Sequence, residues 1–168
     1  MPDTFIKIAS VTVGSGGTTN IEFTSIPSTY TDLVVKFSLR TNTSAPNQDI
    51  SVFLNNNGSG YSYRLLYGSG TTTSSSSGSS TPFAAAVAAT ATSNTFSSGE
   101  FYFPNYAGST NKSYSIDQVL ENNITNAGAY LMAGLWSNTA AINQISFQTG
   151  SGAFVQYSTA TLYGIKNS

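Results

Sequence analysis

The stretch Asp-Leu-Val-Val-Lys-Phe-Ser-Leu-Arg, residues 32–40, decides the fold class. Every second residue from Leu33 to Leu39 is apolar, and the residues between them are polar except for Val34. Successive side chains of a β-strand point to opposite faces, so this alternation predicts a strand with one buried face and one face in water.

Short segments of the same kind recur along the chain, and clusters of Gly, Asn, Ser and Pro separate them. Such punctuation is typical of antiparallel sandwiches and barrels. We therefore predict a single all-β domain over residues 1–168, an antiparallel sandwich of about nine or ten strands. The segments are residues 5–13, 21–23, 33–39, 50–54, 61–67, 100–103, 112–120, 129–136, 142–147 and 159–165.

Two stretches lack this alternation. Residues 69–81 are almost entirely Ser, Thr and Gly, so we expect a flexible, exposed loop there. Residues 82–92 are rich in alanine and fit either a helix, with Thr81 as its cap and Pro82 in its first turn, or a strand of small side chains. The β-branched Val87 and its neighbouring threonines favour the strand.

The composition leaves little material for chemistry. The chain has no histidine and no cysteine, which removes the commonest general base and the thiolate metal ligands. A glycosidase needs only two carboxylates, and Asp49, Glu100 and Glu121 are the candidates for that alternative. These acids lie near turns and strand ends, as surface acids do. We therefore predict no enzyme, no catalytic residues, no cofactor and no metal site.

The charges also limit the partners. Only 8% of the residues are charged, against about 25% in ordinary soluble domains, and the net charge is −1. Six Lys and Arg residues do not form the basic patch that nucleic acids require. No run approaches the roughly 20 apolar residues of a membrane-spanning helix. We therefore expect neither a nucleic-acid nor a membrane partner. So weakly charged a surface is either covered by neighbouring protein chains or kept hydrated by its many Ser, Thr and Asn side chains.

Tyrosines are the candidate contact residues. Tyr61, Tyr63 and Tyr67 fall on one face of a predicted strand, and Tyr102 and Tyr106 follow later in the chain. A tyrosine offers an apolar ring and a polar hydroxyl, which suits a protein interface or a sugar-binding platform. We expect most of the aromatic rings to fill the core of the sandwich and its rim, and only some of these tyrosines to make such contacts.

Several motifs resemble a family of tailed-bacteriophage virion proteins. Their order and spacing match over nearly the whole chain, although they are turns and strand ends without catalytic meaning. The motifs are Ile-Pro-Ser-Thr-Tyr-Thr-Asp-Leu (26–33), Phe-Leu-Asn-Asn-Asn-Gly-Ser-Gly-Tyr-Ser (53–62), Leu-Tyr-Gly (66–68), Asn-Tyr-Ala (105–107), Gly-Leu-Trp-Ser-Asn-Thr-Ala-Ala-Ile (134–142) and Ser-Thr-Ala-Thr-Leu-Tyr-Gly-Ile-Lys (158–166).

The resemblance implies a jelly-roll-like β-sandwich on the outer surface of the phage particle. We expect a structural protein, most similar to a head decoration (cement) protein, that binds the major capsid protein and stabilises contacts between its subunits. The alternative is a carbohydrate-binding or receptor-binding module of a tail fibre or spike. Without a fibrous shaft the head location is favoured, and a homo-oligomer, a trimer, is expected there.

Overall fold

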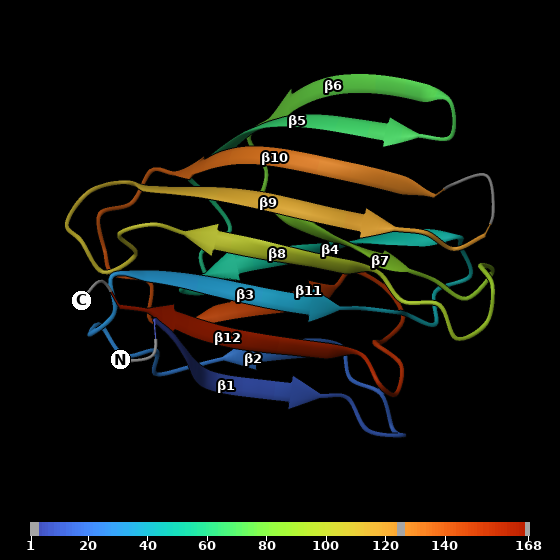
Figure 1. Ribbon diagram of the computed structural model, residues 1–168, viewed down its shortest axis with the longest axis horizontal. Helices are drawn as coiled ribbons and strands as arrows, with labels where there is room; N and C mark the ends of the chain where they lie inside the picture. The colour runs from blue at the N-terminus through green and yellow to red at the C-terminus, as the bar shows by residue number, and fades with distance from the viewer. Residues whose placement is uncertain (1–3, 124–126, 167–168) are drawn as a thin grey trace.

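The computed structural model describes residues 4–123 and 127–166, and it confirms an all-β sandwich (Figure 1). Twelve strands form two antiparallel sheets. The larger sheet has the order β1-β12-β3-β8-β9-β10-β5-β6, and the smaller has the order β2-β11-β4-β7. The strands are β1 (Phe5–Thr12), β2 (Asn20–Phe23), β3 (Asp32–Ser38), β4 (Asn47–Leu54), β5 (Tyr61–Ser69), β6 (Thr72–Gly78), β7 (Phe83–Val87), β8 (Ser98–Phe103), β9 (Lys112–Leu120), β10 (Gly128–Trp136), β11 (Ile145–Thr149) and β12 (Thr159–Ile165).

The connections identify the sandwich as a jelly roll. The chain crosses from one sheet to the other at β1–β2, β2–β3, β3–β4, β4–β5, β6–β7, β7–β8, β10–β11 and β11–β12. Strands β1, β12, β3 and β8 thus face strands β2, β11, β4 and β7, the eight-stranded arrangement of two Greek keys. Two hairpins, β5–β6 and β9–β10, are inserted into this wrapping, and both extend the larger sheet on the side of β8.

Alternation builds the core between the sheets. In β9 the buried and exposed residues alternate without exception from Lys112 to Leu120. In β3 the predicted residues point inward, and Leu33, Val35 and Phe37 are at most 4% exposed. Val34 is also buried although it faces outward, because its neighbours on that face in β8 and β12 are Tyr102 and Tyr163.

The Ser/Thr/Gly tract differs from the prediction. The flexible loop expected at residues 69–81 is wrong over most of its length, because β5 runs to Ser69 and β6 pairs back along it. Gly70 has a φ of 57° and Thr71 is not in the left-handed region, which suits a tight type II′ turn between the strands. Edge-strand residues need no apolar face, so periodicity did not reveal this strand, and the strand count of nine or ten was too low.

The alanine-rich stretch forms β7 over Phe83–Val87, which confirms the strand alternative there. The small side chains from Ala84 to Ala86 are at most 2% exposed, so this edge of the smaller sheet packs closely. Residues 1–3, 124–126 and 167–168 of the predicted domain lie outside the described residues. Among the described residues, no helix is long and apolar enough to cross a membrane.

Candidate interaction surface

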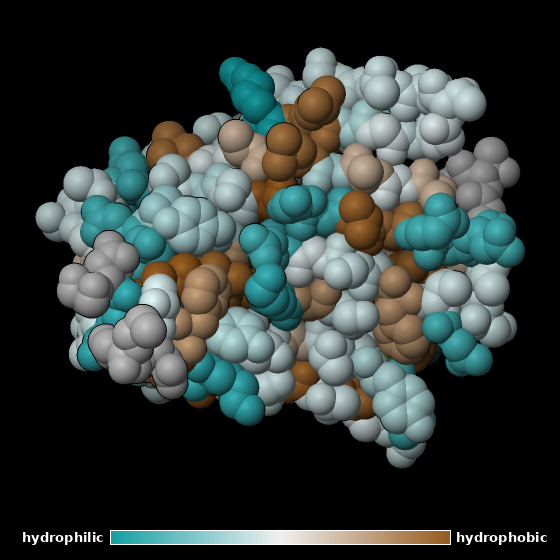
Figure 2. All heavy atoms as spheres, in the orientation of Figure 1, coloured by the Kyte–Doolittle hydropathy of each residue, from teal (hydrophilic) through white to brown (hydrophobic). Residues whose placement is uncertain are grey.

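The outward face of the inserted strands carries exposed apolar side chains. Among the described residues, four of the six exposed large hydrophobic residues lie on this face of β5, β9 and β10. Leu66 and Leu131 are each 56% exposed, Val119 is 47% exposed and Leu135 is 36% exposed. We call the surface formed by Leu66, Val119, Leu131 and Leu135 the outer patch. Figure 2 shows hydrophobic atoms at the surface where β5, β9 and β10 run in Figure 1.

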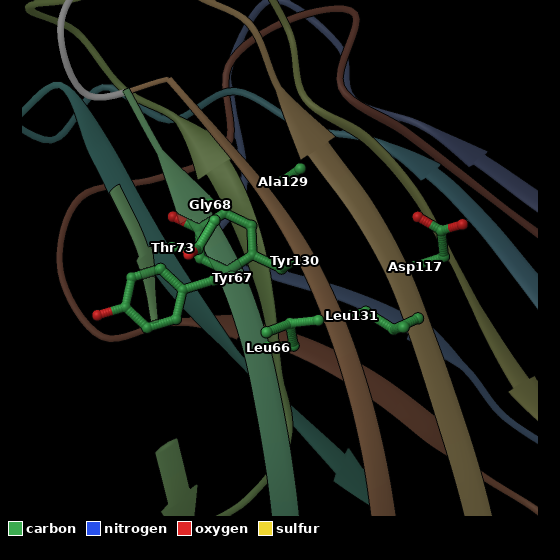
Figure 3. Close-up of a pocket in the computed structure, with 8 residues that line it drawn as sticks. All are labelled: Leu66, Tyr67, Gly68, Thr73, Asp117, Ala129, Tyr130 and Leu131. Atoms are coloured by element: carbon green, nitrogen blue, oxygen red, sulfur yellow. The ribbon is translucent and has the colours of Figure 1, made fainter. Parts of the chain in front are cut away.

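The strand register places Leu66, Leu131 and Val119 in two adjacent outward rows, and Leu135 lies two rows from Leu131, beyond the row of Arg64 and Ala133. Leu131 in β10 lies between Leu66 of β5 and Asp117 of β9 in one row across the sheet (Figure 3). In the adjacent outward row, Ala129 lies between Gly68 and Val119. The small residues of this row beside the leucines leave a depression on the surface, lined by residues of both rows. The outer patch therefore combines protruding leucine side chains with a shallow depression, and paired strands hold both in place.

Polar groups border the outer patch on both sides. Toward the centre of the sheet, the row of Leu131 continues through Asp117 and Glu100 to Lys36. The Lys36 Nζ donates to the Glu100 Oε2 at 2.7 Å, in an exposed ion pair. Toward the edge of the sheet, the same row ends at Ser75 of β6. Exposed apolar patches with a polar rim are typical of interaction sites.

The predicted tyrosines divide into core residues and partly exposed residues. Tyr61 is 4% exposed, and its hydroxyl donates to the Asn57 carbonyl at 2.9 Å and accepts from the Leu54 N–H at 3.0 Å. Tyr106 is fully buried, and its hydroxyl donates to the Pro27 carbonyl. Burial raises the pKa of both phenols. Neither ring offers a contact surface, so the prediction of an interface or glycan contact is wrong for these two residues.

The other three predicted tyrosines remain partly exposed, two of them on one face of β5 and the third in β8. The Tyr102 hydroxyl donates to Asp32 Oδ2 at 2.9 Å on the outer face of the larger sheet. Tyr63 and Tyr67 point to the opposite face of their strand from Leu66. Tyr67 stacks on Tyr130 with ring centroids 6.0 Å apart (Figure 3). The structure therefore joins Tyr63 and Tyr67 in one aromatic cluster through Phe83 and Tyr130 and leaves Tyr102 apart, and the contact role of the three tyrosines stays a prediction.

The candidate acids are also separated. Asp49 lies on the face of the smaller sheet that points away from the core, whereas Glu100 lies on the outward face of the larger sheet. Burial raises the pKa of Asp49. Glu121 follows the end of β9. Asp117 is the acid that does lie opposite Glu100, on an open face beside Lys36. Within the described residues, no three His, Cys, Asp or Glu side chains gather where they could hold a metal ion.

The residues of the outer patch were not among those predicted from the sequence, although the alternation in two segments indicates them. In Tyr61–Ser69 the alternation that turns the tyrosines inward leaves Leu66 among the outward residues. In Gly128–Trp136 apolar residues occupy both sets of alternate positions. A strand that is apolar on both faces, within an antiparallel sheet with one wet face, indicates a second contact.

A scan of the chain against models of protein families finds no match, and a search of curated proteins finds no relative.

Proposed function

We propose that this protein is a structural component of a phage particle, a decoration protein that binds the outside of the head and bridges major capsid subunits. The observation that carries the proposal is the outer patch, a group of exposed apolar side chains on a rigid sheet. The resemblance of the turn motifs to phage virion proteins supplies the kind of particle, and the low charge favours a surface that is covered in the assembly.

The outer patch can supply the affinity that such a role requires. Burial of one exposed leucine side chain contributes roughly 1.5–3 kcal/mol, so Leu66 and Leu131 are the anchors of the contact. Asp117, Arg64 and the ion pair of Lys36 with Glu100 form the polar rim that sets the orientation. If the protein binds as an oligomer, each oligomer engages several sites of the shell at once. Its overall affinity then exceeds the modest affinity of a single contact.

Chemical cross-linking of intact particles tests the proposal. Lys36 lies in the same row as Leu66 and Leu131 and is exposed, so an amine-reactive cross-linker should join it to the major capsid protein. Lys112 is 1% exposed and serves as the internal control that should not react. Cross-links from Lys36 only to tail proteins, in particles that carry this protein, would contradict the head location.

A carbohydrate-binding role is the second candidate, and one observation favours it. Tyr67 and Tyr130 stack and stay partly exposed. Burial and the nearby carboxylate of Asp49 raise the pKa of Tyr130. An exposed aromatic face offers an apolar surface to a sugar ring, and a nearby carboxylate accepts hydrogen bonds from sugar hydroxyls. A glycan array on the isolated protein tests the second role: saturable binding that Tyr130→Ala abolishes and Leu131→Thr leaves unchanged would establish carbohydrate binding at this face, and absence of binding would contradict it.

A further inference from the structure

The two sheets end in four edge strands, and three of these edges are protected against pairing with another chain. Strand β1 has an irregular register between Lys7 and Ala9, and Lys7 adds a charge. Strand β2 is only four residues long and carries Glu22. Bulges, charges and short length are the usual means of preventing a sheet edge from recruiting a further strand.

The third protected edge is that of β7, which is covered from within the molecule. The Ala85 N–H donates to the Gln118 Oε1 at 2.8 Å, and the Val87 N–H donates to the Leu39 carbonyl at 3.3 Å. The Thr41 N–H donates to the Val87 carbonyl at 2.8 Å. Backbone groups of β7 that face away from β4 are thus already bonded.

Strand β6 has none of these protections. Its seven residues, Thr72–Gly78, include no charge and no proline, and its register with β5 is uninterrupted. Five of the seven residues are exposed, and among the described strands β5 alone pairs with β6. Within residues 4–123 and 127–166, β6 is therefore the one long, regular edge that remains open to another strand.

The hairpin geometry decides which groups of β6 face outward. In an antiparallel pair, hydrogen-bonded and non-bonded residue pairs alternate. A two-residue turn is closed by a hydrogen-bonded pair, here Ser69 with Thr72. From Thr73 onward, the residues of β6 therefore direct their backbone groups alternately away from β5 and toward it. Thr73, Ser75 and Ser77 then direct their N–H and C=O groups to the open side.

From this edge we propose that two copies of the chain associate by antiparallel pairing of β6 with β6 of the second copy, about a two-fold axis at Ser75. Ser75 is the midpoint of Thr72–Gly78, so only this register pairs all seven residues. It also matches the outward-facing residues, since Thr73 then meets Ser77 of the second copy and Ser75 meets its own counterpart. An isologous contact of this kind closes after two copies.

The side chains around the axis suit a second copy of the same chain. The strand itself offers only Ser, Thr and Gly, which pair across strands without steric or charge conflict. The nearest charge is Arg64, opposite Ser77. In the proposed register the two Arg64 side chains start roughly 20 Å apart, from strand spacings of about 4.8 Å and rises of about 3.4 Å, which exceeds the screening length of about 8 Å.

This inference goes beyond the proposed function and does not rest on it, and it replaces the expected trimer with a dimer. The joined sheets form one continuous layer in which both outer patches lie on the same face. Leu66 of each copy lies in the row of Ser75, so the two leucines stand about 14 Å apart across the axis. A dimer would therefore present a doubled apolar surface to any partner.

Light scattering on the purified chain tests the pairing. A contact of one strand pair is smaller than a standard interface, so we expect a mass that rises with concentration from 17.6 kDa towards twice that value. Ser75→Pro removes an N–H on the open side and should weaken dimerisation at least tenfold, while the bonds of β6 to β5 remain. Ser75→Thr keeps the N–H and should dimerise as the unchanged chain does.

Opposite charges provide a second, independent test of the register. Ser75→Lys and Ser75→Glu should each be monomeric, because like charges would meet at the axis, and an equimolar mixture should form the mixed dimer. Circular dichroism checks that each variant is folded. A chain that stays monomeric at its solubility limit, a trimer, a dimer insensitive to Ser75→Pro, or a mixture that fails to associate would each overturn the proposal.

Discussion

Gln118 of β9 binds the free edge of β7 with its side-chain amide. Its Oε1 accepts from the Ala85 N–H at 2.8 Å, and its Nε2 donates to the Phe83 carbonyl at 3.5 Å. The side chain is 1% exposed and projects from the larger sheet across the core boundary to the smaller sheet. One glutamine thus occupies the place of a neighbouring strand and ties the two layers of the sandwich together.

Replacement of Gln118 should therefore be costly. Gln118→Leu keeps a similar volume but leaves buried backbone groups of β7 without partners, which costs about 1–3 kcal/mol. Urea unfolding should show this loss as a lower midpoint with an unchanged slope. Gln156→Leu is the control, because Gln156 is exposed and should change the free energy of unfolding by less than about 0.5 kcal/mol. Equal changes in the free energy of unfolding for the two substitutions would contradict the structural role of Gln118.

Two buried tyrosines should respond in opposite directions to the same substitution. The Tyr114 hydroxyl is buried and has no hydrogen-bond partner among the residues that the structure describes, so Tyr114→Phe should raise the free energy of unfolding by about 1–2 kcal/mol. The Tyr61 hydroxyl has a donor and an acceptor from the backbone, so Tyr61→Phe should lower it by about 1–2 kcal/mol. Urea unfolding of both variants measures the difference. Destabilisation by Tyr114→Phe would contradict the inference that the Tyr114 hydroxyl is buried without a hydrogen bond.

The buried phenols also predict a loss of stability at alkaline pH. Burial is the main cause that raises the pKa of Tyr61, Tyr106 and Tyr114 above the ordinary value. Below about pH 10 both the folded and the unfolded chain keep these protons, and above it the unfolded chain releases them first. The free energy of unfolding should therefore fall as the pH rises above about 10. The advantage of Tyr114→Phe over the unchanged chain should grow in the same range, and a constant advantage would argue against this linkage.

Lys112 is a buried cation that holds two loops together. Its Nζ donates to the carbonyls of Gly108 at 2.6 Å, Thr110, and Thr139 at 3.3 Å. Lys112→Met keeps the apolar stem and removes the donors, so we expect a loss of about 3 kcal/mol. Lys36→Met breaks the exposed ion pair and should cost less than about 1 kcal/mol. Thermal and urea unfolding that rank the two lysines in the reverse order would refute this assignment.

Some of this structure could be predicted from the sequence because it depends on local alternation. The pattern from Leu33 to Leu39 predicts β3 with the correct inward residues, and the segment expected at residues 112–120 is β9. The jelly-roll arrangement came from the resemblance of the turn motifs, and the sheet order bears it out. Strand order depends on contacts between residues far apart in the chain, which alternation alone does not specify.

Other features depend on such long-range contacts and escaped the prediction. Strand β6 has no apolar periodicity, and its pairing with β5 after the turn at Gly70 makes it a strand. Most aromatic rings were expected in the core, but the sequence did not specify which: Tyr61 and Tyr106 fit there because backbone groups of looped or distant segments bind their hydroxyls. The outer patch arises where outward residues of β5, β9 and β10 come into register, and no single segment contains it.

Binding of the purified chain to phage heads stripped of it tests the central proposal most directly. Leu66→Thr combined with Leu131→Thr should stay folded and bind roughly a hundredfold more weakly, because two leucine anchors contribute about 3 kcal/mol or more. Tyr157→Asn removes a ring that is 67% exposed outside the outer patch, and its φ of 73° suits asparagine, so this control should bind normally. Heads that bind the double variant as tightly as the unchanged chain would contradict the outer patch as the attachment surface.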